Sequence, residues 1–193
     1  MKLSLDAEKR YTYADCLTWP EGKQCELVNG FIRNMPVHDA RHQEISTNMS
    51  LELYGFIKRY YKGKGEVFYA PFVVRFPKNG ETGDDLIDTV VQPDICVVCD
   101  RSKLDENGCL GAPDFIAEIQ SPLTVKYNLD EKFKLYETAG VQEYWIISPE
   151  GETVQVFILQ PDGKYDQGTL YETGKVPVYV FEGIEVELKN IFQ

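Results

Sequence analysis

Two carboxylates on apolar segments are the residues of this chain best placed to do chemistry. Asp94 opens the apolar run ICVV, and Glu118 lies inside the apolar segment FIAEIQ. A carboxylate in a buried strand is costly unless it is paired or binds a cation. Glu118 is therefore hard to explain as a structural residue, whereas Asp94 could also cap the start of its strand. Two such acids on neighbouring strands predict a divalent-metal site suited to phosphodiester hydrolysis.

A lysine and a tyrosine follow the two acids on a predicted helix over residues 128–139. Lys132 and Tyr136 are four residues apart, so they share one helical face beside the apolar stripe. From that face Lys132 can reach the edge of the sheet near Glu118. The alternative is a solvated lysine, as expected for Lys134.

The remaining polar candidates carry weaker signals. Glu26, in CELVNG, either lines the same site or is an exposed strand residue, and His42, in ARHQEIS, is by default a polar residue at a helix start. Asp114 precedes its strand, which favours a cap or turn. Cys96 and Cys99 stand three apart in one strand, so they point to opposite faces and cannot chelate one zinc ion. Buried thiols are expected instead.

These side chains need a sheet and helices to position them, and the hydrophobic patterns supply both. The long helix is expected to bury a stripe made of Ile45, Met49, Leu53, Phe56 and Tyr60. The predicted elements are a helix over 13–19 capped by Thr12, a hairpin turning at Asn29-Gly30, a helix over 42–61, strands over 66–69, 72–76, 95–99, 115–120 and 143–148, loops over 77–89 and 100–113, the helix over 128–139, and a strand meander over 153–180. This order predicts an α/β (α+β) domain with a mixed sheet.

Length and composition set the frame for that domain. With 193 residues and 43% hydrophobic content, the chain fits one domain, with a core over about 12–150 and a C-terminal β extension over about 151–193. The polar N-terminus is unlike a secretory signal, and no apolar run approaches the roughly 20 residues of a membrane span. The expected location is the cytoplasm, without a membrane partner, and the five cysteines are expected as free thiols.

Charge limits the partners. A net charge of -11 argues against non-specific coating of nucleic acid, which depends on many lysine and arginine contacts to phosphates. It allows a nuclease, because a bound metal can supply the local positive charge. We expect weak contact with DNA and a homodimer, since symmetric dimers are common and suit a duplex. The segment VPVYVF (176–181) reads as an exposed apolar edge, and is expected to form the dimer contact or a lid.

In its combination of motifs the chain resembles the restriction-endonuclease family known as Uma-two, of the PD-(D/E)XK nuclease superfamily. The matching motifs run from about residue 12 to 160 in family order. They are ELVNG, RHQ, VQPDI, GAPDFIAEIQSP, the pair Lys132 and Tyr136, and AGVQEYWII. The resemblance implies a restriction-endonuclease-like core, a mixed sheet flanked by helices, and hydrolysis of DNA phosphodiester bonds.

The resemblance also implies roles for individual residues. Asp94 and Glu118, with the backbone carbonyl of Ile119, would hold Mg²⁺ or Mn²⁺. Glu26 would orient a water or bind a second ion, and His42 would position Glu26 or the substrate.

The catalytic lysine is where the chain departs from the superfamily. That lysine normally stands two residues after the glutamate, a position that Gln120 occupies here, and the family supplies it from the next helix as Lys132. This departure leaves two alternatives open. One is a catalytically degenerate binding or scaffold protein, and the other is a nuclease acting on RNA.

Overall fold

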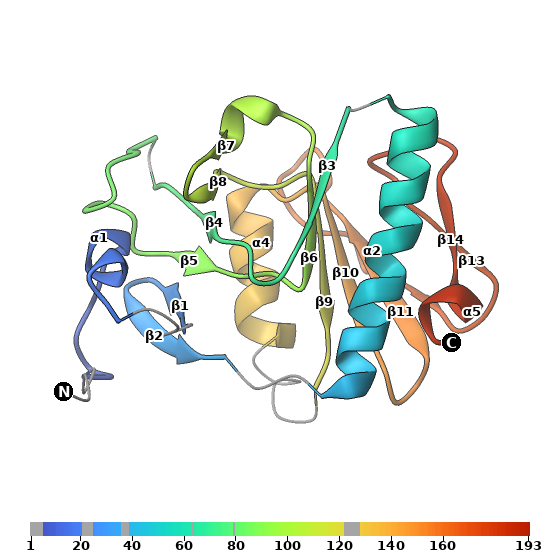
Figure 1. Ribbon diagram of the computed structural model, residues 1–193, viewed down its shortest axis with the longest axis horizontal. Helices are drawn as coiled ribbons and strands as arrows, with labels where there is room; N and C mark the ends of the chain where they lie inside the picture. Colours follow the sequence, from blue (N-terminus) through green and yellow to red (C-terminus); the bar gives the residue numbers. More distant parts are fainter. Residues whose placement is uncertain (1–5, 21–24, 36–38, 63, 79, 122–127) are drawn as a thin grey trace.

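The computed structural model describes residues 6–20, 25–35, 39–62, 64–78, 80–121 and 128–193, without the side chains of Cys25, Asn34, Asn128 and Leu129. Its centre is a six-stranded mixed sheet in the order β12-β11-β10-β9-β6-β3 (Figure 1). The strands are β3 (Glu66–Tyr69), β6 (Ile95–Val98), β9 (Phe115–Ile119), β10 (Glu143–Ser148), β11 (Thr153–Ile158) and β12 (Thr169–Tyr171). β9 and β10 are parallel, and the other neighbours are antiparallel.

Helices cover both faces of this sheet, as Figure 1 shows for α2 (Ala40–Tyr60) and α4 (Phe133–Ala139). Strand residues alternate between two hydrophobic clusters, because successive side chains of a strand point to opposite faces. In β9, Phe115 and Ala117 pack on the α2 side, whereas Ile116 packs on the α4 side with Tyr136. Glu118 has the parity of Ile116 and therefore faces α4.

A second six-stranded sheet, in the order β2-β1-β5-β4-β8-β7, lies beside the first. Its strands are β1 (Cys25–Val28), β2 (Phe31–Asn34), β4 (Val74–Arg75), β5 (Val90–Val91), β7 (Leu104–Asp105) and β8 (Gly108–Leu110). The predicted hairpin is confirmed, because Asn29 and Gly30 turn with φ of 52° and 84°, the left-handed geometry that the Asn-Gly pair favours. The predicted loop over 100–113 was wrong in part. It contains β7, β8 and the 3-10 turn η1 (Arg101–Lys103), whose short strands have too few residues to show a period.

The first helix begins after Thr12 as predicted, whereas α2 begins at Ala40, two residues before the predicted start at His42. The Asp15 carboxylate accepts the backbone N–H of Thr12 at 2.8 Å at the start of α1 (Tyr13–Leu17), and Asp39 accepts the N–H of His42 at 2.8 Å at the start of α2. The predicted stripe of α2 was wrong at its end. Tyr60 is 62% exposed, and Ile57 is buried in its place. A π-helical turn, η2 (Asn128–Lys132), leads into α4, which ends at Gly140 in the left-handed region, φ 86°.

The C-terminal segment packs on the α2 side of the central sheet. It contains the two-stranded sheet β13 (Lys175–Pro177) and β14 (Glu185–Glu187) and the short helix α5 (Leu188–Ile191) (Figure 1). The expectation of an exposed apolar edge in VPVYVF was wrong for most of the segment, although Tyr179 is 54% exposed. Val176, Val178 and Phe181 are buried in the cluster that α2 shares. In the described part of the chain no helix combines the length and apolarity that crossing a membrane requires.

Candidate active site

The register of β6 and β9 brings the two predicted acids together. Ile95 lies opposite Ala117 in this antiparallel pair, and continuing the register by one residue sets Asp94 opposite Glu118. The N–H of Ile119 donates to Asp94 Oδ2 at 2.8 Å, which ties the aspartate to the strand that carries the glutamate. Asp94 and Glu118 are only 4% and 3% exposed. Both acids are thus buried on adjoining strands, where a charge needs a partner.

Lys132 supplies that partner from the start of the helical segment. Its Nζ lies 2.8 Å from Glu118 Oε1 and 3.0 Å from Glu26 Oε1, and the residue is 5% exposed. One helical turn later, the hydroxyl of Tyr136 donates to the same Glu118 oxygen at 2.6 Å. Lys132 is therefore a buried cation shared by two carboxylates and not a solvated lysine.

Glu26 reaches this group from β1 of the second sheet. It is buried, and its Oε1 also accepts the backbone N–H of Gln92 at 3.0 Å. Gln92 stands two residues before Asp94, so the segment between the two sheets holds Glu26 and presents Asp94 at the same place. Glu26 is therefore an acid that lines the same site and not an exposed strand residue.

His42 contacts the site from the opposite side, in the first turn of α2. Its Nε2 lies 3.2 Å from Asp94 Oδ2, and both side chains are buried. Asp39 anchors the backbone of His42 as the helix cap. His42 was expected to position Glu26 or the substrate. In the structure its described side-chain contact is with Asp94.

The pKa of Glu118 reflects the ionisable groups around it. Its pKa is raised from 4.5 to about 7, first by burial, with Asp94 and Glu26 raising it further and Lys132 opposing them. Burial and the neighbouring Glu118 charge also raise the pKa of Tyr136, so its hydroxyl stays a donor. Three acids around one lysine leave this pocket of the core with an excess of negative charge.

Gln120 and Asp114 lie outside the group. Gln120, at the superfamily's lysine position, uses its backbone N–H to bond the carbonyl of Ile147, and no hydrogen bond in the described residues joins its side chain to the acids. Asp114 accepts the N–H of Cys99 at 2.7 Å, the structural role expected for it. Cys96 and Cys99 are free thiols in different hydrophobic clusters, in agreement with the rejection of a zinc site.

Arg33 is the residue that the sequence reasoning missed. It lies opposite Glu26 in the hairpin and forms a two-pronged ion pair with Glu131, with Nε to Oε2 at 2.9 Å and Nη2 to Oε1 at 2.6 Å. Glu131 precedes Lys132, so this second ion pair fastens the hairpin to the helix at the rim of the site. A signal was available, because Glu26 and Arg33 are equally far from the Asn-Gly turn.

The donor atoms suit a hard divalent cation. Within the described residues, Lys132 and Tyr136 both bond Glu118 through Oε1. Carboxylate and carbonyl oxygens are the ligands of Mg²⁺ and Mn²⁺, and the excess negative charge beside Glu118 favours a cation there. A site built from side chains alone is not found. No three His, Cys, Asp or Glu side chains among the described residues are arranged to hold a metal. Asp94 and Glu118 are the two buried carboxylates on adjoining strands that could contribute oxygen ligands.

A solved structure and a family model match this chain. The structure is a protein from Anabaena variabilis ATCC 29413 described as "a putative nuclease belonging to DUF820". It shares 23% identity and a TM-score of 0.74, over 94% of this chain and 97% of the other. The two proteins thus share a fold, a mixed α+β arrangement of sheets and helices. The family model Uma2, described as "Putative restriction endonuclease", matches residues 13–189, and the chain belongs to this family. No match was found among curated proteins.

Proposed function

We propose that this protein is a metal-dependent endonuclease that hydrolyses phosphodiester bonds in DNA. The observation that carries the proposal is the buried group around Lys132, whose ammonium lies within 3.0 Å of two carboxylates from different sheets. A third acid, Asp94, lies on the adjoining strand, where His42 and the N–H of Ile119 contact it. Family membership supports the same class of reaction.

The metal would be Mg²⁺ or Mn²⁺, held by Asp94, Glu118 and the carbonyl of Ile119. Such an ion lowers the pKa of a bound water and neutralises charge on a phosphate. The chain's own residues orient the ligands. His42 and the N–H of Ile119 contact Asp94, and the hydroxyl of Tyr136 contacts Glu118, so each carboxylate has a partner that holds its orientation.

Lys132 and Glu26 act on the substrate side of the proposal. Lys132 stabilises the negative charge that develops on the phosphate as the bond breaks. Glu26, which shares the lysine, orients the attacking water or accepts its proton. Because the lysine comes from a helix and not from the strand, Gln120 need not supply a charge.

A plasmid cleavage assay tests the proposal. Supercoiled plasmid with Mg²⁺ or Mn²⁺ is expected to be nicked or linearised, and chelation by EDTA is expected to stop the reaction. Asp94→Asn removes a ligand charge while keeping the shape of the side chain, so it is also expected to be inactive. Structured and single-stranded RNA of matched length form the second arm. RNA cleavage without DNA cleavage would overturn the DNA assignment. Cleavage that persists in EDTA would overturn the metal dependence, and absent cleavage of both substrates would leave the scaffold alternative.

A further inference from the structure

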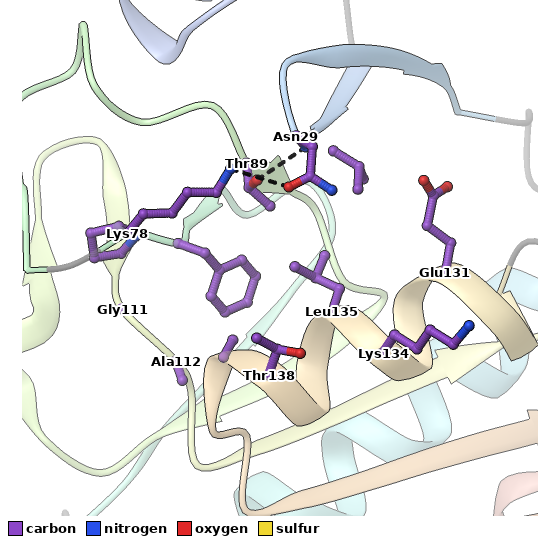
Figure 2. A pocket seen from close by; sticks show the side chains of 13 residues that line it. Asn29, Lys78, Thr89, Gly111, Ala112, Glu131, Lys134, Leu135 and Thr138 are labelled. Atoms are coloured by element: carbon purple, nitrogen blue, oxygen red, sulfur yellow. Dashed lines mark hydrogen bonds between the residues drawn. The ribbon is translucent and has the colours of Figure 1, made fainter. Parts of the chain in front are cut away.

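A cavity of about 650 Å³ lies next to the buried acids and takes part in none of their contacts. Its walls come from the turn of the β1–β2 hairpin, the segments around β4 and β5, the residues that follow β8, and one face of η2 and α4 (Figure 2). Figure 2 shows Glu131, Lys134, Leu135 and Thr138 on the helix, with Asn29, Thr89 and Lys78 across from them. The volume falls within the range of roughly 300 to 1,000 Å³ that small-ligand sites occupy.

The cavity adjoins the acids on two elements at once. Along β1, Glu26 and Val28 share one face since they are two residues apart, and Glu26 reaches Lys132 while Val28 lines the cavity. Along the helix, Lys132 and Tyr136 project from the face next to the one that carries Leu135. The cavity therefore lies beside the strand that carries Glu26 and the helical segment that carries Lys132.

The lining combines an apolar interior with polar groups at the mouth. Val28, Phe76, Pro77 and Leu135 supply apolar surface, and Phe76 adds an aromatic ring that packs against Tyr136 at 6.1 Å between centroids. Flat aromatic and apolar walls are what a nucleobase stacks on.

The charges at the mouth are balanced except for one lysine. Lys78 is held by Asp88 at 2.7 Å and by Asn29, and Glu131 is held by Arg33. Lys134 is exposed and pairs with no acid among the described residues. One surplus cation at the rim of an apolar cavity matches a ligand with a neutral flat body and one phosphate.

We infer that this cavity binds one nucleoside of the substrate, next to the phosphate that the acids address, and that Lys134 contacts a phosphate of that nucleotide. The inference takes the identity of its substrate from the proposed function. The binding measurement that tests it does not depend on that function. Binding a base in such a cavity requires a single strand or a base taken out of the duplex stack.

The test measures binding of thymidine 5′-monophosphate, thymidine and inorganic phosphate by calorimetry or NMR titration, in metal-free buffer with EDTA. Thr138→Trp fills the mouth from an exposed position and is expected to weaken binding of the monophosphate and the nucleoside by about tenfold. Thr173→Trp, an exposed threonine in the turn after β12, is the matched control and is expected to bind like the native chain.

Lys134→Ala separates the two parts of the ligand. It is expected to weaken the monophosphate by about two- to fivefold, as for one exposed ion pair, and to leave thymidine unchanged. Lys64→Ala, another exposed lysine, is its control. Equal affinity in Thr138→Trp and Thr173→Trp, or no saturable binding, overturns the inference. Cavity-dependent binding in a chain that does not cleave plasmid would instead overturn only the nuclease proposal, and cleavage without such binding would overturn only the cavity.

Discussion

Two buried glutamates on neighbouring parallel strands have similarly raised pKa values but lie among different neighbours. Glu118 of β9 and Glu143 of β10 both have a pKa raised from 4.5 to about 7, and burial is the largest cause for each. They lie on opposite faces of the central sheet. Glu118 faces α4 among Asp94, Glu26 and Lys132. Glu143 faces the C-terminal segment, where its two oxygens accept the indole N–H of Trp145 at 2.6 Å and the backbone N–H of Val180 at 2.8 Å.

The contrast shows that burial and a shifted pKa do not by themselves mark a reactive site. Glu143 is satisfied by two N–H donors, and in the described residues no lysine or arginine pairs with it, so its role is to fasten the C-terminal segment to the sheet. Glu118 has further acids around it that raise its pKa more. Convergence of several ionisable groups is therefore the feature that distinguishes the candidate site.

The largest expected difference concerns activity. Glu118→Gln keeps the shape of the side chain but removes its charge, and we expect metal-dependent plasmid cleavage to fall at least about a hundredfold. Glu143→Gln, on the other face, is expected to cleave at the native rate per folded molecule. Initial rates of nicking at equal concentrations of folded protein give the comparison. Equal losses in both variants would mean that Glu118 has no special role.

Lys132 pairs with Glu118, whereas no lysine or arginine among the described residues pairs with Glu143. Loss of Lys132 should therefore have a large effect on stability. Lys132→Ala leaves Glu26 and Glu118 buried side by side without their shared cation, and is expected to lower the free energy of unfolding by about 3 to 5 kcal/mol. Lys134→Ala, two residues along the same helix but exposed, should leave the urea unfolding curve unchanged. Unfolding curves of the two variants that coincide would show that Lys132 is not buried between the acids.

Stability should also separate the two glutamine variants, in the reverse order of activity. In Glu143→Gln the amide cannot accept both N–H groups, and we expect a loss of about 1 to 3 kcal/mol. In Glu118→Gln the amide oxygen can still accept from Lys132 and Tyr136, and the charge beside Asp94 is gone, so no such loss is expected. Denaturant unfolding at pH 7 measures both losses. A Glu143→Gln variant more stable than the native chain would contradict the role of Glu143 in fastening the C-terminal segment to the sheet.

The two glutamates should share one effect, which is the pH dependence of stability. A glutamate whose pKa is raised in the folded state stabilises fully below its unfolded value of 4.5, and this stabilisation is lost as the pH rises to about 7. Each glutamine variant lacks this loss, so its stability relative to the native chain should increase between pH 5 and pH 8. Parallel stability curves for native and variant proteins would show that the carboxyl group titrates normally.

Local sequence patterns were sufficient for many of the elements. The Asn29-Gly30 turn, the strand over 143–148 and the end of α4 at Gly140 follow from residues close together in the chain, whose backbone preferences act locally. The elements that failed were short or marginal. β7 and β8 have too few residues for a hydrophobic period, and at the end of α2 either Ile57 or Tyr60 could continue the apolar stripe.

The acid pair itself was predictable from the sequence, because an acid inside an apolar strand has few structural explanations and strand alternation restricts where it can point. The same rule applied to Glu143, yet nothing local shows that the N–H of Val180 would satisfy it. The burial of Lys132 between two sheets, the contact of His42 with Asp94 and the cavity beside Leu135 depend on how distant segments pack. Residue types and periods determine which side chains face the core, whereas the angle and register at which the elements meet determine which of those side chains touch.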